Sequence, residues 1–247
     1  MLKIEKINKK FGGLHAIKNL SFTIEKGPIS AIIGPNGAGK TTVFNLLTGV
    51  FKVDSGKIFF EDRDITNFQS YQIARLGITR TFQNLQIFTN MTVLENIMTG
   101  FYLKSKQNLF HSMFRLNLKE EKFIREKSLE LLDILNLTQY ANSDTKILPF
   151  GILRQVEIVR ALASSPKLIL MDEPAAGLNT FETDILAENI KKIKDLGVTI
   201  LLIEHDMNLV MKICEKIIVL NFGEKIAEGK AEEIQKDERV IKAYLGE

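Results

Sequence analysis

The chain has 247 residues, enough for one large domain or two small ones, and its apolar fraction of 45% is ordinary for a globular protein. Its 33 basic and 30 acidic residues leave a net charge of +3, too small to indicate a nucleic-acid partner, and we predict none. The single cysteine, Cys214, excludes an internal disulfide and favours a reducing compartment, with the thiol as a small buried apolar group.

Neither the apolar runs nor the first residues of the chain indicate a membrane segment. The longest apolar runs, such as residues 198–203, are far shorter than the ~20 residues that a span requires. Residues 1–13 have neither the apolar core nor the small-residue cleavage site of a signal peptide. We therefore expect a chain that is soluble when isolated and stays in the cytosol, with any membrane role exercised through partners.

The first sixty residues predict short strands separated by glycine-rich turns, at 3–7, 21–26 and 57–61. Residues 30–34, SAIIG, form a further buried strand that runs directly into a glycine-rich loop. Residues 41–49 then have helical spacing that ends at Gly49.

Helical spacing dominates the middle of the chain, at residues 91–104 and 119–137. Strands and helices alternate afterwards: a helix at 151–163, a strand at 168–173, a helix at 181–197, a strand at 198–206, a helix at 207–214 and a hairpin at 216–229 with Gly223 in its turn. This order predicts a single domain, 1–247, in which an α/β core carries an inserted, mostly helical subdomain at 85–158.

The loop GPNGAGKTT matches the phosphate-binding pattern G-x-x-x-x-G-K-[ST], with a strand before it and a helix after it. Its backbone N–H groups and the helix N-terminus favour the negative charge of phosphates. Lys40 is expected to reach the β- and γ-phosphates and the Thr41 hydroxyl to hold Mg²⁺. The predicted ATP-binding residues of this loop are Gly34, Pro35, Asn36, Gly37, Ala38, Gly39, Lys40, Thr41 and Thr42.

A buried strand, LILMDE, places two acids at its end. Asp172 is suited to holding Mg²⁺ through water. Strand alternation would point Glu173 away from Asp172, but at the strand's end it can turn toward the γ-phosphate and act on the attacking water. Gln83 and His205 also end predicted strands. Because ligands gather at the carboxyl ends of parallel strands, we expect Gly34, Gln83, Asp172 and His205 on one rim.

In this order the motifs resemble those of an ABC-transporter ATP-binding subunit, over essentially the whole chain. The resemblance implies a P-loop NTPase core of the ABC type with an antiparallel β subdomain and an inserted α-helical subdomain. It implies that Phe11 stacks on adenine, that Gln83 touches Mg²⁺ and the attacking water, and that His205 bonds the γ-phosphate. Residues 175–179, AAGLN, resemble the D-loop, with Asn179 where many relatives carry Asp.

The segment LPFGILRQVEIVRAL occupies the position of the family's signature, commonly LSGGQ, which covers the ATP of a second cassette packed head to tail. Pro149 removes the usual serine hydroxyl, and a hydrogen bond to a charged phosphate contributes ~1.5–3 kcal/mol. Proline suits a helix start, and glycine at 151 still permits close approach. We interpret the signature residues Leu148, Pro149, Phe150 and Gly151 as a working variant; nothing in the sequence explains Ile152.

Several outer segments, among them RTFQNLQIF, DEPAAGLN and the ending VIKAYLGE, are similar to the LivG-type subunits of branched-chain amino acid importers. That resemblance implies an ATPase on the cytoplasmic face of the cell membrane. It implies as partners two permease subunits, a second cassette (a LivF-type sibling or a second copy) and, indirectly, an extracytoplasmic substrate-binding protein. By the same resemblance, residues 85–88 dock the permease. The alternatives are a lipopolysaccharide-exporter ATPase and a soluble ABC ATPase outside transport.

Residues 102–127 carry a net charge of +4, from seven Lys/Arg and three Glu, and include several large apolar side chains. They fit either a basic amphipathic surface near anionic headgroups or a solvated helix whose apolar stripe packs on the core, and the second reading is favoured.

Overall fold

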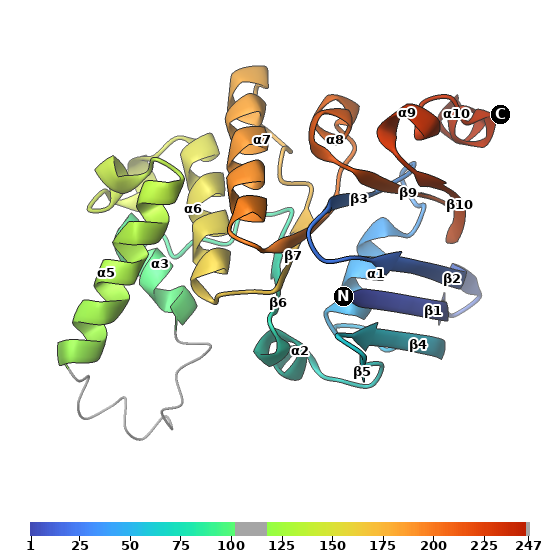
Figure 1. The fold of residues 1–247 in the computed structure, drawn as a ribbon, viewed down its shortest axis with the longest axis horizontal. Coiled ribbons are helices and arrows are strands. Elements are labelled where there is room, and N and C mark those ends of the chain that lie inside the picture. Colours follow the sequence, from blue (N-terminus) through green and yellow to red (C-terminus); the bar gives the residue numbers. More distant parts are fainter. Residues whose placement is uncertain (102–117, 246–247) are drawn as a thin grey trace.

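The structure is a computed structural model, and it describes residues 1–101 and 118–245. Figure 1 shows two β-sheets, with helices α3, α5 and α6 gathered at the end of the molecule opposite the antiparallel strands β1, β2 and β4. The predicted fold class, a P-loop core with an antiparallel β subdomain and a helical subdomain, is confirmed.

The smaller sheet is antiparallel, with the order β2-β1-β4-β5. Its strands are β1 (Leu2–Phe11), β2 (Leu14–Ile24), β4 (Ser55–Phe60) and β5 (Arg63–Asp64). Alternation places Leu2, Ile4 and Ile58 in the core, where they pack with Phe44 of the helix that follows the glycine-rich loop.

The larger sheet has the order β10-β9-β3-β8-β7-β6 and is parallel except for β10, which forms a hairpin with β9. Its strands are β3 (Ile29–Ile33), β6 (Ile78–Thr81), β7 (Leu168–Asp172), β8 (Thr199–Ile203), β9 (Lys216–Asn221) and β10 (Glu224–Gly229). Since β3, β8, β7 and β6 are consecutive and parallel, their carboxyl ends share one edge, as predicted.

Both faces of this sheet are covered, which explains why the inner strands β3, β7 and β8 are buried along their whole length and almost continuously apolar. In β7, Ile169 and Met171 belong to the core shared with α3, α6 and α7, whereas Leu168 and Leu170 belong to the core shared with α1 and the smaller sheet. The helices are α1 (Lys40–Leu47), α2 (Ser70–Leu76), α3 (Val93–Phe101), α5 (Leu118–Ile134), α6 (Phe150–Ala163), α7 (Thr180–Asp195), α8 (Met207–Ile213), α9 (Ala231–Ile234) and α10 (Glu238–Leu245).

Most of the expected helices and strands are present within one to three residues of their predicted bounds. Two strands of the smaller sheet are longer than predicted: β1 continues four residues beyond the predicted 3–7, and β2 begins seven residues before the predicted 21–26. Helix α3 is described only to Phe101, and the rest of the predicted helix 91–104 lies outside the described residues. The basic segment 102–127 is described only from Leu118, where α5 begins. The sequence reasoning did not predict α2, α9 and α10. Across the described residues, no helix combines the length and apolar character needed to traverse a bilayer.

Candidate active site

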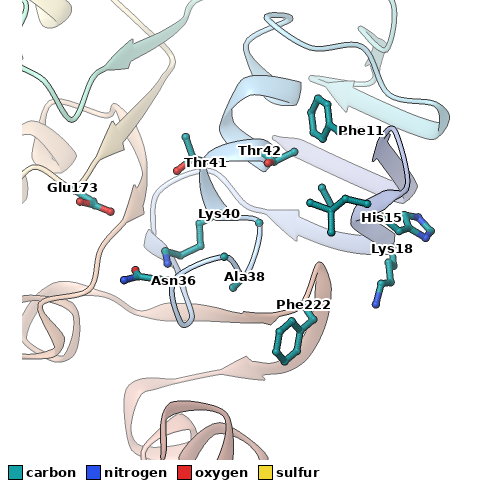
Figure 2. A pocket seen from close by; sticks show the side chains of 14 residues that line it. Phe11, His15, Lys18, Asn36, Ala38, Lys40, Thr41, Thr42, Glu173 and Phe222 are labelled. Carbon is teal, nitrogen blue, oxygen red and sulfur yellow. The ribbon is translucent and has the colours of Figure 1, made fainter. Parts of the chain in front are cut away.

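A cavity of about 610 Å³ opens beside the loop that joins β3 to α1. Figure 2 shows Lys40, Thr41 and Thr42 on one side of it, Phe11 and His15 on another, and Glu173 approaching from β7. The predicted loop residues Asn36, Gly37, Ala38 and Gly39 also line it. Its size and mixed polar and apolar walls are those of a small-molecule site.

Close packing against β9 and hydrogen bonds from Lys40 fix the shape of the loop from Gly34 to Gly39. A Cβ on Gly34 would lie 2.1 Å from the carbonyl oxygen of Leu220, so only glycine fits between the loop and β9. Lys40 donates hydrogen bonds to the Gly34 and Pro35 carbonyls at 2.7 and 3.0 Å. Burial lowers the pKa of Lys40, and the negative charges of Glu173 and Asp172 oppose this shift. The ammonium group thus lies inside the loop that would cradle phosphates.

Two exposed aromatic rings lie on the cavity wall. Phe11, at the end of β1, is 40% exposed and makes an edge contact with Phe51, with 5.1 Å between ring centroids. Phe222, in the β9–β10 turn, is 76% exposed. The Gly223 N–H donates to the Ala38 carbonyl at 3.0 Å and fixes that turn to the loop. Sequence reasoning missed Phe222; a large apolar residue in a tight hairpin turn was the available signal.

Three of the predicted polar residues meet at the shared strand edge. Glu173 turns there because its φ of 47° is left-handed. Its Oε2 accepts a hydrogen bond from Gln83 Nε2 at 2.7 Å and lies 3.7 Å from His205 Nδ1. Glu173 also lines the cavity. The structure therefore brings Gln83, Glu173 and His205 together beside the loop.

Asp172 has a partner that the sequence reasoning missed. Arg80, on β6, donates to Asp172 Oδ2 at 2.5 Å and to Asn45 Oδ1 at 2.6 Å. Both members of the ion pair are nearly buried. Asp172 and the Thr41 hydroxyl offer hard oxygen donors of the type that Mg²⁺ prefers. Asp172 ends β7 and Thr41 follows the loop after β3, two strands away on the same edge of the sheet. Nothing in the spacing of RTFQ and MDE indicated that Arg80 would face Asp172.

A second unpredicted residue, Glu204, joins two segments at this edge through hydrogen bonds. It is fully buried, and its carboxylate accepts hydrogen bonds from the backbone N–H groups of Ala175, His205 and Asp206 at 2.8, 3.0 and 3.2 Å. Burial raises the pKa of Glu204, and these three donors oppose the shift. Glu204 therefore links the segment after Glu173 to the segment that carries His205.

The signature residues 148–151 do not line the cavity. Pro149 is the N-cap of α6, and Phe150 packs its ring against Gly177, where an added Cβ would lie 3.2 Å from it. A Cβ on Gly151 would lie 2.5 Å from Glu182 Oε1. Leu148 and Ile152 are partly buried against the main core, which gives Ile152 the structural role that the sequence left unexplained.

Asn179 is engaged in a helix cap. Its side chain accepts from the Glu182 N–H, and its own N–H donates to Glu182 Oε2, both at 3.0 Å. This capping box begins α7. The Asn-x-x-Glu spacing before an amphipathic run was the available signal for this cap, which the sequence analysis did not predict. His15, which the sequence analysis did not assign to the site, lines the cavity, and its Nε2 lies 3.1 Å from Asn8 Oδ1.

Comparisons with known proteins agree with this geometry. Residues 17–176 match the family model described as ABC transporter, and residues 224–247 match the model described as branched-chain amino acid ATP-binding cassette transporter. The chain is 40% identical to the high-affinity branched-chain amino acid transport ATP-binding protein BraF of Pseudomonas aeruginosa and 42% identical to the LivG protein of Salmonella typhimurium. Both alignments cover 100% of this chain and 98% of the relative.

Solved structures give the same result. The ADP conformation of an ATP-binding cassette of an ABC transporter superposes with a TM-score of 0.88 at 35% identity, covering 100% of this chain and 99% of that one. A dimeric cassette in a post-hydrolysis state with ADP and phosphate gives 0.78 at 28% identity, covering 94% and 99%. With the matching model, relatives and fold in agreement, the chain belongs to the ABC transporter family and is one of its ATP-binding, ATP-hydrolysing subunits.

Proposed function

We propose that this chain is the motor subunit of an importer for branched-chain amino acids, acting at the cytoplasmic face of the cell membrane. The observation that carries hydrolysis is the grouping of Glu173, Gln83 and His205 beside the phosphate loop. The substrate class rests on the C-terminal match over residues 224–247 and on the relatives' names. The same match supports import over the lipopolysaccharide-exporter alternative.

In this proposal each side chain has one role. Lys40 and the backbone of residues 34–39 hold the phosphates of ATP, and Phe11 stacks on adenine, an interaction of about 0.5–1.5 kcal/mol. Glu173 orients the attacking water and accepts its proton, while His205 donates to the γ-phosphate. Mg²⁺, held by Thr41, Asp172 and Gln83, would neutralise charge on the phosphates.

The signature residues Leu148, Pro149, Phe150 and Gly151 act on the ATP of a second cassette, which is either a sibling or a second copy. Their separation from the cavity of their own chain supports this division. The contacts of Phe150 with Gly177 and of Gly151 with Glu182 support a joint movement of signature and D-loop, including Asn179, when the two cassettes close.

Two permease subunits complete the proposed assembly, and an extracytoplasmic binding protein delivers cargo to them. A groove of about 420 Å³ lies between β6 and the helical subdomain, taken as residues 85–158. Its wall includes Ile87 and Phe88, and Phe88 is 48% exposed. This apolar wall supports docking of a permease helix at residues 85–88.

The first test is recovery of the tagged chain from detergent-solubilised native membranes, with partners identified by mass spectrometry. Two multi-span permeases and a second cassette are expected. The recovered assembly, reconstituted in vesicles with its binding protein, should accumulate labelled leucine, isoleucine or valine when ATP is supplied. The matched control is Lys40→Ala, which should assemble equally well and transport nothing. Recovery without any membrane protein would contradict the transport function, and a permease pair that moves no branched-chain amino acid would contradict only the cargo.

A further inference from the structure

The loop that carries Gln83 is fastened to α6 by side chains with no place in the mechanism above. Arg154 donates from Nη1 to the Phe82 carbonyl and from Nη2 to the Gln83 carbonyl, both at 2.8 Å. Glu157 accepts from the Gln86 N–H at 3.2 Å. Arg160, one turn further along α6, donates to the Gln86 carbonyl. The backbone on both sides of Gln83 is thus held by one helix.

Arg154 and Glu157 are also paired with each other, at 2.8 Å, with side chains only 1% and 2% exposed. Taking two charges out of water costs several kcal/mol, and apolar residues of similar volume often stabilise a core as well or better. Stability alone therefore gives little reason for this pair. The pair instead fixes the orientation of the Gln83 loop, because the planar guanidinium holds two backbone carbonyls and a carboxylate in one plane.

The held loop leads directly to the proposed base. Gln83 Nε2 donates to Glu173 Oε2 at 2.7 Å, so the position of the Gln83 backbone sets where that amide meets the carboxylate. The same helix begins at the signature turn. Gly151 lies one helical turn before Arg154, and the Arg154 guanidinium lies 5.5 Å from the ring centroid of Phe150. One rigid helix thus contacts both the signature and the Gln83 loop.

We infer that Arg154 and Glu157 are positioning residues for ATP hydrolysis: they hold Gln83 in register with Glu173 and tie that register to the signature turn of the same chain. This inference rests on the proposed role of Glu173. Displacement of a catalytic group by about 1 Å can reduce a rate by about a hundredfold, so loosening the loop lowers turnover while leaving the phosphate loop intact.

The test compares two conservative variants with a matched control. Arg154→Lys keeps the charge but cannot bond two carbonyls in one plane, and Glu157→Gln keeps the shape but removes the charge. The control is Asn189→Ala, which deletes the buried 2.9 Å hydrogen bond from Asn189 Nδ2 to Gln155 Oε1. That bond fastens the neighbouring position of α6 to α7, away from the loop. Thermal melting of each purified chain establishes that it is folded.

On the isolated chain, both variants should speed hydrogen exchange of the amides in residues 82–86, while the control should not. Affinity for a fluorescent ATP analogue, measured without Mg²⁺, should change by less than about twofold, because the phosphate loop is untouched. On the assembled transporter, kcat should fall by about tenfold to a hundredfold. Combined with Gln83→Ala, Arg154→Lys should add no further loss, since both act through one side chain.

A loss in Arg154→Lys that multiplies with that of Gln83→Ala would show a separate structural effect and overturn the inference. An equal loss in Asn189→Ala, or parental kcat in both α6 variants, would overturn it too. If Glu157→Gln alone folds, the same comparisons apply to it. Failure of the proposed function would give a different result. Glu173→Gln in the parent chain would then still hydrolyse ATP, whereas the faster hydrogen exchange of residues 82–86 in the two α6 variants would remain.

Discussion

Cys214 illustrates how burial determines the chemistry of a single residue. It is 7% exposed beside α8, as the sequence predicted, and burial together with the charges of Glu204 and Glu215 raises the pKa of its thiol to about 12. Only the thiolate is a nucleophile. The folded chain should therefore resist iodoacetamide at pH 8 and react once guanidinium unfolds it. Rapid labelling of the native chain, followed by mass spectrometry, would contradict this burial.

Asp54 links a residue to a pH dependence. Its carboxylate accepts from Lys9 Nζ at 2.8 Å and from the Lys10 N–H at 2.6 Å, and these bonds hold its pKa below the ordinary 3.8. A pKa depressed by folding adds stability above the unfolded value, and that stability is lost as the pH falls through the folded value.

Asp54→Asn should therefore lower Tm at pH 7, while the difference from the parent should shrink below pH 4 and vanish under the folded pKa. Melting curves from pH 7 to pH 2.5 test this. The control is Asp184→Asn, whose exposed pair with Lys212 should matter little at any pH. A difference in Tm between variant and parent that persists at pH 2.5 would mean that the substitution destabilises the chain for a reason other than the lost charge.

At the scale of elements, α3 and α6 pack closely against each other. A Cβ on Gly100 of α3 would lie 2.3 Å from the Arg160 carbonyl oxygen and 2.7 Å from the Ala163 Cβ. Glycine inside a helix ordinarily costs about 1 kcal/mol relative to alanine. Here the glycine lets the backbones of α3 and α6 approach closely, so the effect of Gly100 on stability depends on the packing of α6 and not on helix propensity alone.

Gly100→Ala should consequently destabilise the chain by about 1–3 kcal/mol, reversing the sign that helix propensity gives. Denaturant unfolding of purified chains measures it. Gly13→Ala, where an added Cβ meets no atom within 4 Å, is the control and should be nearly neutral. A stabilised Gly100→Ala chain would mean that α3 can shift along α6 without loss.

At the scale of the whole molecule, the proposed site exists only because four strands end on one edge. Glu173→Gln preserves the size of the side chain and removes the proposed base. It should bind ATP with parental affinity, lower turnover by at least about a hundredfold, and hold two cassettes closed. Light scattering of the chain with ATP, alone and with the cassette recovered from membranes, measures closure and identifies the partner. Hydrolysis at the parental rate would remove Glu173 from the mechanism.

The contiguous features of this protein could be predicted from its sequence. The phosphate loop is one short segment between a strand and a helix, so its residue pattern already specifies its shape. The apolar run at 168–171 predicted a buried strand and residues 198–206 a further strand, and the structure buries both faces of each. Parallel strands imply one shared edge. Resemblance to a family added Phe11 and the signature, whose roles no local pattern displays.

Only the tertiary structure decided which side chains face each other across the fold. Arg80 and Asp172 are 92 positions apart, and Arg154 and Phe82 are 72 apart. Sheet order and the packing of α6 set these pairs, and neither leaves a periodic trace in the chain. Ile152 shows the same limit, because its environment is a core assembled from distant segments. Local chain geometry is encoded residue by residue, whereas the partners of a buried charge depend on how every element packs.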